Sequence, residues 1–280
     1  MSADLAELAL SRGSALPITA YMEKWRREGS IMDMDCLRIA MEAMYKDVST
    51  GNRSDGRGRL RPSKIGNPCQ RAQAFSYFGA EQEEKPDWVQ EKAKGGSLAH
   101  YWFQAEGMSA GVLTDIEVEI DIPQWRLKGQ LDGFIVDGSI FELKTISTDK
   151  FNGRFKGWIP VAKWEEPKED HIRQVHAYML ATGATSASVV YMDRGEQAFK
   201  EFRVKLDENL LDQMDTEAKK LLKNADKGIL PERMFGCEML QDGYNPADHS
   251  VNEVNKWLAG MKWCDYKDMC RLADLEEWSI

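Results

Sequence analysis

Residues 129–144 read GQLDGFIVDGSIFELK and are the part of the chain most informative about its fold. Its Asp-Gly pair at 137–138 is a strong two-residue turn signal between two apolar-rich runs, which predicts a β-hairpin. Because alternate side chains of a strand share a face, Glu142 and Lys144 should point the same way. Pairing of the two strands would bring Asp132 close to Glu142. The stretch therefore predicts two carboxylates and one lysine at one end of a twisted hairpin.

Two interpretations of this charged set are open. Carboxylate oxygens are the ligands that Mg²⁺ or Mn²⁺ prefers, and a neighbouring ammonium group can position or activate a water. The alternative is a surface ion pair between strands, which stabilises little. The flanking helices favour the first interpretation. His100 lies on a predicted helix just before the strands. After them, His171, Gln174 and Tyr178 share one stripe of a second helix, where polar groups are unusual for a core-facing position.

Periodicity on both sides of the hairpin predicts the remaining elements. A helix, three strands, a second helix and a further strand favour a mixed β-sheet with helices packed on it, an α/β (α+β) fold. Gly, Pro, Ser and Arg predict a loop over residues 51–68. The expected elements are a helical region at 1–50, a helix at 86–107, strands at 112–122, 125–136 and 139–146, a helix at 170–182 capped by Gly183, strands at 186–192 and 197–204, a helix at 207–227, and helical turns at 251–258.

The ordered motifs resemble those of the PD-(D/E)XK nuclease superfamily, and within it the RecB-like exonuclease branch. The resemblance covers roughly residues 86–194 and rests on several weak motifs that occur in the right order. It implies a restriction-endonuclease-like αβββαβ core with helical N-terminal and C-terminal extensions. The motifs are His100, Gly129-x-x-Asp132, Glu142-x-Lys144 and Gln174-x-x-x-Tyr178.

The resemblance also implies a role for each motif residue. His100, Asp132, Glu142 and the backbone carbonyl of Leu143 would bind Mg²⁺ or Mn²⁺. Lys144 would orient or activate the attacking water, whereas Gln174 and Tyr178 would hold the scissile strand or the lysine. We expect a helical region at 1–85 with a basic loop and the first cluster cysteine, a nuclease core at 86–206, and a cysteine-bearing tail at 207–280 that packs back on the core.

The chain has 5 cysteines, of which Cys36 lies on an apolar helical stripe and is expected to be a buried thiol. The others resemble the iron–sulfur ligands of CRISPR-associated RecB-like and AddB-type nucleases, with one cysteine before the core and three after it. Cys69, Cys264 and Cys270 match that pattern, but Met261 stands where a further ligand is expected. Cys237 would then be the fourth ligand. A [4Fe–4S] cluster is favoured over zinc, and free thiols are the third alternative.

The charges constrain how the chain could bind DNA. With 46 acidic and 37 basic residues the net charge is −9, which excludes a uniformly basic DNA-coating protein. Bases nevertheless gather at 53–71, and others alternate with aromatic residues at 151–164, an arrangement suited to single-stranded DNA. The predicted DNA-binding residues are Arg59, Arg61, Lys64, Arg71, Arg154 and Lys156.

The function expected from the motifs and the resemblance is a metal-dependent DNA exonuclease that acts on single-stranded ends in replication, recombination or repair. The alternatives are a duplex-end or structure-specific endonuclease and a catalytically silent nucleic-acid-binding or adaptor protein. The intact Asp132, Glu142 and Lys144 set argues against the silent alternative. The N-terminus lacks a basic flank followed by an apolar run, so we expect a cytoplasmic protein without a membrane partner.

Overall fold

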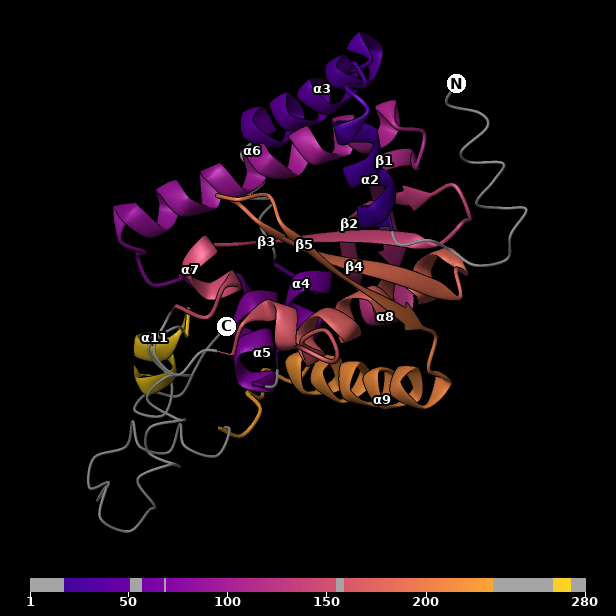
Figure 1. Ribbon diagram of the computed structural model, residues 1–280. Coiled ribbons are helices and arrows are strands. Elements are labelled where there is room, and N and C mark those ends of the chain that lie inside the picture. The colour runs from indigo at the N-terminus through magenta and orange to yellow at the C-terminus, as the bar shows by residue number, and fades with distance from the viewer. Residues whose placement is uncertain (1–17, 51–56, 68, 155–158, 234–263, 273–280) are drawn as a thin grey trace.

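The computed structural model describes residues 18–50, 57–67, 69–154, 159–233 and 264–272. Its centre is a mixed sheet in the order β1-β2-β3-β4-β5 with helices on both faces (Figure 1). The expected α/β fold is therefore confirmed. The strands are β1 (Leu113–Ile122), β2 (Leu127–Ile135), β3 (Ile140–Ile146), β4 (Ser186–Asp193) and β5 (Phe199–Lys205).

Helices surround this sheet, and none of those described is long and apolar enough to cross a bilayer. They are α2 (Ile18–Arg27), α3 (Met34–Thr50), α4 (Pro62–Ile65), α5 (Gln70–Phe78), α6 (Asp87–Ser109), α7 (Thr148–Phe151), α8 (Glu169–Thr182), α9 (Glu208–Ala225) and α11 (Lys267–Leu272). Two short 3₁₀ turns, Pro123–Trp125 and Val161–Lys163, complete the described elements.

The predicted order of elements is confirmed, and most boundaries move by one or two residues. Gly138 has φ 80° at the hairpin turn, and Gly183 ends α8 in the left-handed conformation as expected. The expectation of a continuous loop at 51–68 is wrong for its second half, because Pro62 begins the short helix α4. The helical turns expected at 251–258 lie outside the described residues.

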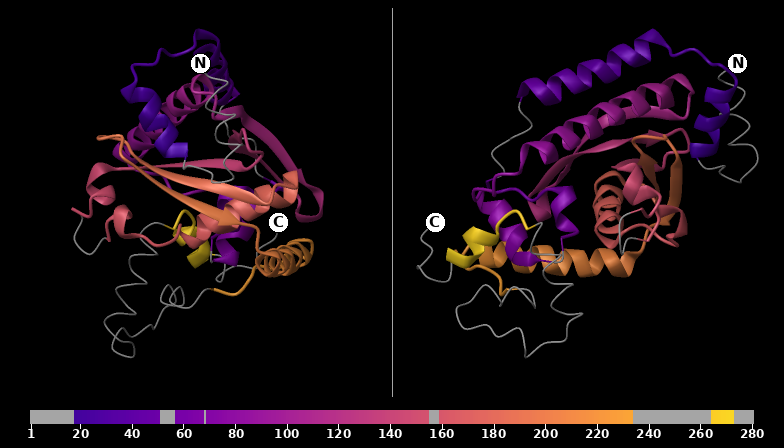
Figure 2. Two further views of the ribbon diagram at one scale, coloured as in Figure 1. Left: turned by 45° about the vertical axis from the view of Figure 1, so that its right-hand side comes forward. Right: turned by 60° about the vertical axis from the view of Figure 1, so that its left-hand side comes forward.

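The alternation of side chains along β3 and β4 divides the core between two helical layers. Phe141 and Leu143 pack with Phe103 of α6 in one apolar cluster. Ile140 instead joins the larger cluster on the other face, together with Val175 of α8. Views from two further directions show α6 and α3 over one face of the sheet and α8 and α9 over the other (Figure 2). Glu142 and Lys144 alternate with the apolar residues, so they share the α8 side of β3.

The pairing between β2 and β3 ends shortly after their turn. Only Gly133 with Phe141 and Phe134 with Ile140 are paired between these strands. Farther from the turn, β2 pairs with β1 and β3 pairs in parallel with β4. Asp132 therefore lies where the two hairpin strands separate, and this separation makes room for polar side chains from both faces of the sheet.

Candidate active site

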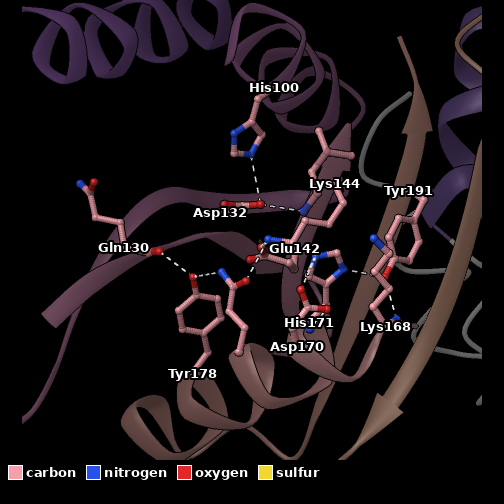
Figure 3. A network of polar contacts seen from close by, with 12 residues as sticks. His100, Gln130, Asp132, Glu142, Lys144, Lys168, Asp170, His171, Tyr178 and Tyr191 are labelled. Carbon is pink, nitrogen blue, oxygen red and sulfur yellow. Dashed lines mark hydrogen bonds and ion pairs between the residues drawn. The ribbon is translucent and has the colours of Figure 1, made fainter. Parts of the chain in front are cut away.

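The predicted carboxylate pair forms where β2 and β3 separate (Figure 3). The Asp132 carboxylate accepts a hydrogen bond of 2.6 Å from the backbone N–H of Leu143. Its Oδ2 also lies 3.2 Å from Nε2 of His100 on α6. Strand β2 and helix α6 therefore place an imidazole and a carboxylate side by side.

Lys144 begins a chain of polar contacts that crosses to α8 (Figure 3). Its Nζ lies 2.5 Å from Oε1 of Glu142 and donates to Oε1 of Gln174 at 2.9 Å. Nε2 of Gln174 donates to the Tyr178 hydroxyl at 2.7 Å, and that hydroxyl donates to the carbonyl of Gln130 at 3.0 Å. Because residues four apart lie on one helix face, α8 can supply both Gln174 and Tyr178. The lysine is thereby held between a carboxylate and an amide.

Burial and mutual repulsion set the charges of the site. Burial raises the pKa of Glu142 to about 7, and the nearby Asp132 carboxylate adds to this shift although Lys144 opposes it. Burial disfavours the charged form of His100, but Asp132 and the neighbouring carboxylates outweigh it and raise the pKa of His100 to about 9. Burial likewise opposes the charge of Lys144, and the same carboxylates keep its pKa above the ordinary value. The site therefore favours positive charge.

Glu117 of β1 belongs to this site, although sequence reasoning did not single it out. One ligand atom each from His100, Glu117 and Asp132 lie within 4.8 Å of one another. Glu117 is one of several acids that alternate with aliphatic residues in its strand. Periodicity places these acids on a strand but does not show which of them faces α6.

The donor set fits a divalent cation. Oε2 of Glu142 is buried and has no hydrogen-bond partner in the described part of the chain, and Nε2 of His100 has only its contact with Asp132. An unpartnered buried polar atom is costly, so a cation bound by Glu142 beside this pair would be stabilising. Carboxylate oxygens with one imidazole suit Mg²⁺ or Mn²⁺.

The site is open to solvent through two adjoining hollows. One, of about 480 Å³, is lined by the site residues together with Arg61, Ser63 and Lys128. The other, of about 450 Å³, shares Lys144 and is also lined by Arg194. Cationic and hydroxyl side chains along both hollows give an anionic ligand access to the buried carboxylates.

His171, which shares a helical stripe with Gln174 and Tyr178, contacts Tyr191 of β4. Its Nδ1 lies 2.7 Å from the hydroxyl of Tyr191, a β4 residue that pairs with Lys144. Burial, with Lys144 and Lys168 nearby, lowers the pKa of His171 to about 3, so its ring is neutral at pH 7. Tyr191 also accepts from the backbone N–H of Lys168 at 3.1 Å. Tyr191 was missed because a tyrosine in an apolar strand resembles any core residue.

The predicted DNA-binding residues are dispersed. Arg61 lines the larger hollow, and Arg59 and Arg154 are exposed. Lys64 is half-buried and forms an ion pair of 2.8 Å with Asp265. Lys156 lies outside the described residues.

Arg71 departs from the expectation of a surface DNA contact. Its side chain is buried, its guanidinium donates to the carbonyl of Pro231 at 3.1 Å, and it lies over the ring of Phe75. An arginine inside a run of bases can therefore serve packing, because the helix that carries it turns that position inward.

Three of the cysteines gather near α5 and α11. Cys69, Cys264 and Cys270 belong to one small cluster with Phe75 and Tyr266. Burial raises the pKa of the Cys264 thiol, and the two neighbouring cysteines add to the shift. Their Sγ atoms do not all lie within 4.8 Å of one another, since the only such group of metal-ligating atoms in the described ranges contains no cysteine. Cys237, the predicted fourth ligand, falls outside those ranges.

Comparison with known proteins gives one family match. The model of the PD-(D/E)XK nuclease superfamily matches residues 40–271. Solved structures with similarity include LHK-Exo, an alkaline exonuclease from Laribacter hongkongensis, in complex with dAMP (18% identity, 62% of this chain and 90% of that chain, TM-score 0.48). A phage-related exonuclease from Haemophilus somnus 129PT is similar at 15% identity, over 60% of this chain and 94% of that chain, with a TM-score of 0.44. No curated protein matches the chain.

Proposed function

The chain belongs to the PD-(D/E)XK nuclease superfamily, and we propose that it is a Mg²⁺- or Mn²⁺-dependent DNA exonuclease acting on single-stranded ends. The observation that carries this proposal is the convergence of Asp132, Glu142, Lys144 and His100 in a solvent-open hollow. A role in replication, recombination or repair is part of the proposal. The motifs that resemble RecB-like exonucleases support exonuclease over endonuclease action.

The residues have distinct tasks in the proposed reaction. His100, Asp132 and Glu142 would hold the cation with the carbonyl of Leu143, and the cation would lower the pKa of a water and stabilise charge that develops on the phosphate. Lys144 is cationic and held by Gln174, so it can orient the attacking water and stabilise negative charge beside it. Tyr178 anchors Gln174 to β2 and so fixes the position of the lysine.

A preference for single strands is supported by aromatic and basic groups near α8. The Lys168 ammonium lies 5.7 Å from the centre of the Trp164 ring. Burial lowers the pKa of Lys168, and the charges of Lys150 and Lys144 nearby act in the same direction. Aromatic rings beside cations form the stacking platforms on which single-stranded nucleic acid binds. This region adjoins the site through Lys144.

A [4Fe–4S] cluster at Cys69, Cys264, Cys270 and Cys237 is a second part of the proposal. The gathering of three of these thiols from distant parts of the chain supports it. Zinc is held by ligand atoms in a small tetrahedron, whereas the larger cluster separates its thiolates more widely. A tail that brings these thiols together would accept either group, and we propose the cluster because the cysteine arrangement resembles that of the iron–sulfur nucleases. Its role would be to tie the tail to α5.

Cleavage of end-labelled linear DNA, compared with cleavage of circular DNA, tests the proposed activity. With Mg²⁺ or Mn²⁺ we expect linear single strands to be shortened from an end, circular single strands to stay intact, and EDTA to stop the reaction. The Asp132→Ala variant should be folded and inactive. Cutting of circles would indicate an endonuclease instead, and DNA binding without cleavage under all metal conditions would indicate the silent adaptor.

A further inference from the structure

Glu117 has an unusual backbone for a residue inside a strand. Its φ is 50°, in the left-handed region that residues other than glycine rarely adopt. The pairing of β1 with β2 also skips it, because Ile116 pairs with Gly133 and Val118 with Leu131 while Glu117 and Asp132 form no pair. Such strain persists where the surrounding structure imposes it, and it concentrates at functional sites.

The consequence of this backbone is a close approach of two acids. Glu117 and Asp132 occupy opposite positions on neighbouring strands. One carboxylate oxygen of each acid and one ring nitrogen of His100 all lie within 4.8 Å of one another. Like charges directly opposite across a strand pair are destabilising. Backbone strain and like-charge repulsion at the same position are hard to explain by folding stability alone, whereas a cation between the acids would offset the repulsion.

Gln104 holds this arrangement from α6. It is fully buried, and its Nε2 donates to Oε1 of Glu117 at 2.7 Å and to the backbone carbonyl of Asp132 at 2.8 Å. Because Gln104 follows His100 by four residues, both side chains project from one helix face. One amide group therefore fixes the Glu117 carboxylate relative to the strand that carries Asp132.

We propose that Glu117 binds the same divalent cation as His100 and Asp132, and that Gln104 is the positioning residue that holds the Glu117 carboxylate in place. The inference deepens the proposed metal-dependent function and rests on it. If Glu117 were only a structural partner of Gln104, loss of its charge would not change cation binding.

Mn²⁺ binding in the absence of DNA tests the role of Glu117. Electron paramagnetic resonance of free Mn²⁺ gives the affinity, and thermal unfolding in EDTA gives the stability of the metal-free protein. Glu117→Gln keeps an acceptor for Gln104 but removes the charge. We expect Mn²⁺ affinity to fall roughly 10- to 100-fold, as for other groups that support a metal site. The metal-free melting temperature should rise, because the repulsion with Asp132 is removed.

Glu119→Gln is the matched control, since Glu119 is an exposed acid of the same strand that pairs with Lys46. It should leave Mn²⁺ affinity unchanged. An unchanged affinity in Glu117→Gln, or the absence of Mn²⁺ binding by the wild-type protein, would overturn the inference.

A double-mutant cycle tests the positioning role. Gln104→Leu should weaken Mn²⁺ binding about 10-fold in the wild-type background but have no further effect when Glu117 is already Gln. Gln73→Leu is the matched control, because Gln73 is also buried and donates to backbone carbonyls away from the site. An equal loss in both backgrounds would show that Gln104 does not act through Glu117.

These measurements separate the inference from the proposed function because no DNA is present. A protein that binds Mn²⁺ through Glu117 but cleaves no DNA would keep the inference and overturn the exonuclease proposal. A protein that cleaves linear DNA, and whose Mn²⁺ affinity is indifferent to Glu117→Gln, would do the reverse.

Discussion

The active site and the cysteine cluster both gather polar side chains from distant parts of the chain, but they are supported differently. The site residues project from the sheet strands β1, β2 and β3 and from the helices α6 and α8, which pack on the two faces of that sheet. Cys69 instead caps the start of α5, and Cys264 and Cys270 lie in or beside the short helix α11. Regular strands and helices therefore position the active-site residues, whereas local contacts around short helices position the cysteines.

The contacts that hold the tail combine ion pairs with a small apolar cluster. Asp265 forms ion pairs with Lys64 at 2.8 Å and with Lys85 at 3.0 Å. The rings of Tyr266 and Phe75 lie 5.6 Å apart. We therefore expect the active site, which lies on regular elements of the sheet and its helices, to tolerate changes in the tail better than the tail tolerates changes in its own contacts. Each prediction below changes one region and asks whether the other responds.

Lys144→Ala should have the largest effect on activity. Loss of the ammonium group beside Glu142 removes the cation that orients the water, so we expect the cleavage rate to fall about 10³-fold. The rate on end-labelled single-stranded DNA measures this, and circular dichroism checks the fold. Lys205→Ala, a change at an exposed lysine of β5, should keep full activity. Retained cleavage in folded Lys144→Ala would remove the lysine from the mechanism.

Cys270→Ala should affect the tail more than the site. If the cysteines hold a cluster, anaerobically purified protein should contain iron and absorb at about 400 nm. The variant should lose both the iron and this absorbance. Loss of the metal should cost about 4 kcal/mol of unfolding free energy. Cys36→Ala is the matched control and should keep the iron. A colourless wild-type protein with neither iron nor zinc would leave free thiols as the remaining interpretation.

Tyr178→Phe should have a smaller effect confined to the site. The change removes the hydroxyl that links Gln174 to the carbonyl of Gln130, which loosens Lys144 without removing it. We expect a rate loss of about 10-fold, the equivalent of one hydrogen bond. Tyr45→Phe, at an exposed position of α3, should have no effect. A loss as large as that of Lys144→Ala would indicate that Tyr178 contacts the substrate directly.

Acidification should destabilise the active-site region and the tail in different pH ranges. His171 stays neutral in the fold down to a pKa of about 3, whereas in the unfolded chain it gains a proton near 6.5. Between these values the unfolded state binds more protons at His171. This residue therefore lowers the free energy of unfolding by up to about 1.4 kcal/mol for each pH unit of acidification. Burial opposes the charge of Asp265, but Lys64 and Lys85 outweigh it and lower its pKa below 3.8. Its stabilisation is therefore lost only in stronger acid.

Urea unfolding at a series of pH values measures both effects. His171→Gln should flatten the pH dependence between about 6.5 and 4, and Asp265→Asn should flatten it only below about 4. Because Glu142, whose pKa is raised to about 7, acts with the opposite sign over this range, the comparison of wild type with His171→Gln isolates His171. An identical pH dependence of the two proteins between pH 6.5 and 4 would contradict a buried neutral His171.

Much of the site could be predicted because strand and helix periods are simple. The turn at 137–138 sets the hairpin, and the two-residue period then places Glu142 and Lys144 on one face. Glu117 could not be predicted, because its position depends on an irregularity in β1 that leaves its neighbours with ordinary strand patterning. Arg71 could not be placed either, because a run of bases does not reveal which of them its helix turns inward.

The order of the elements, the hairpin and the set of charged residues that resembles a nuclease follow from local conformational preferences, so they can be recognised in the amino-acid sequence. The separation of β2 and β3 beside Asp132, the inclusion of Gln104 and Glu117 in the site and the burial of Arg71 become visible in the folded protein. These features depend on how elements far apart in the chain pack, and the free energy of packing is set by the partner surfaces and is not encoded in any one segment.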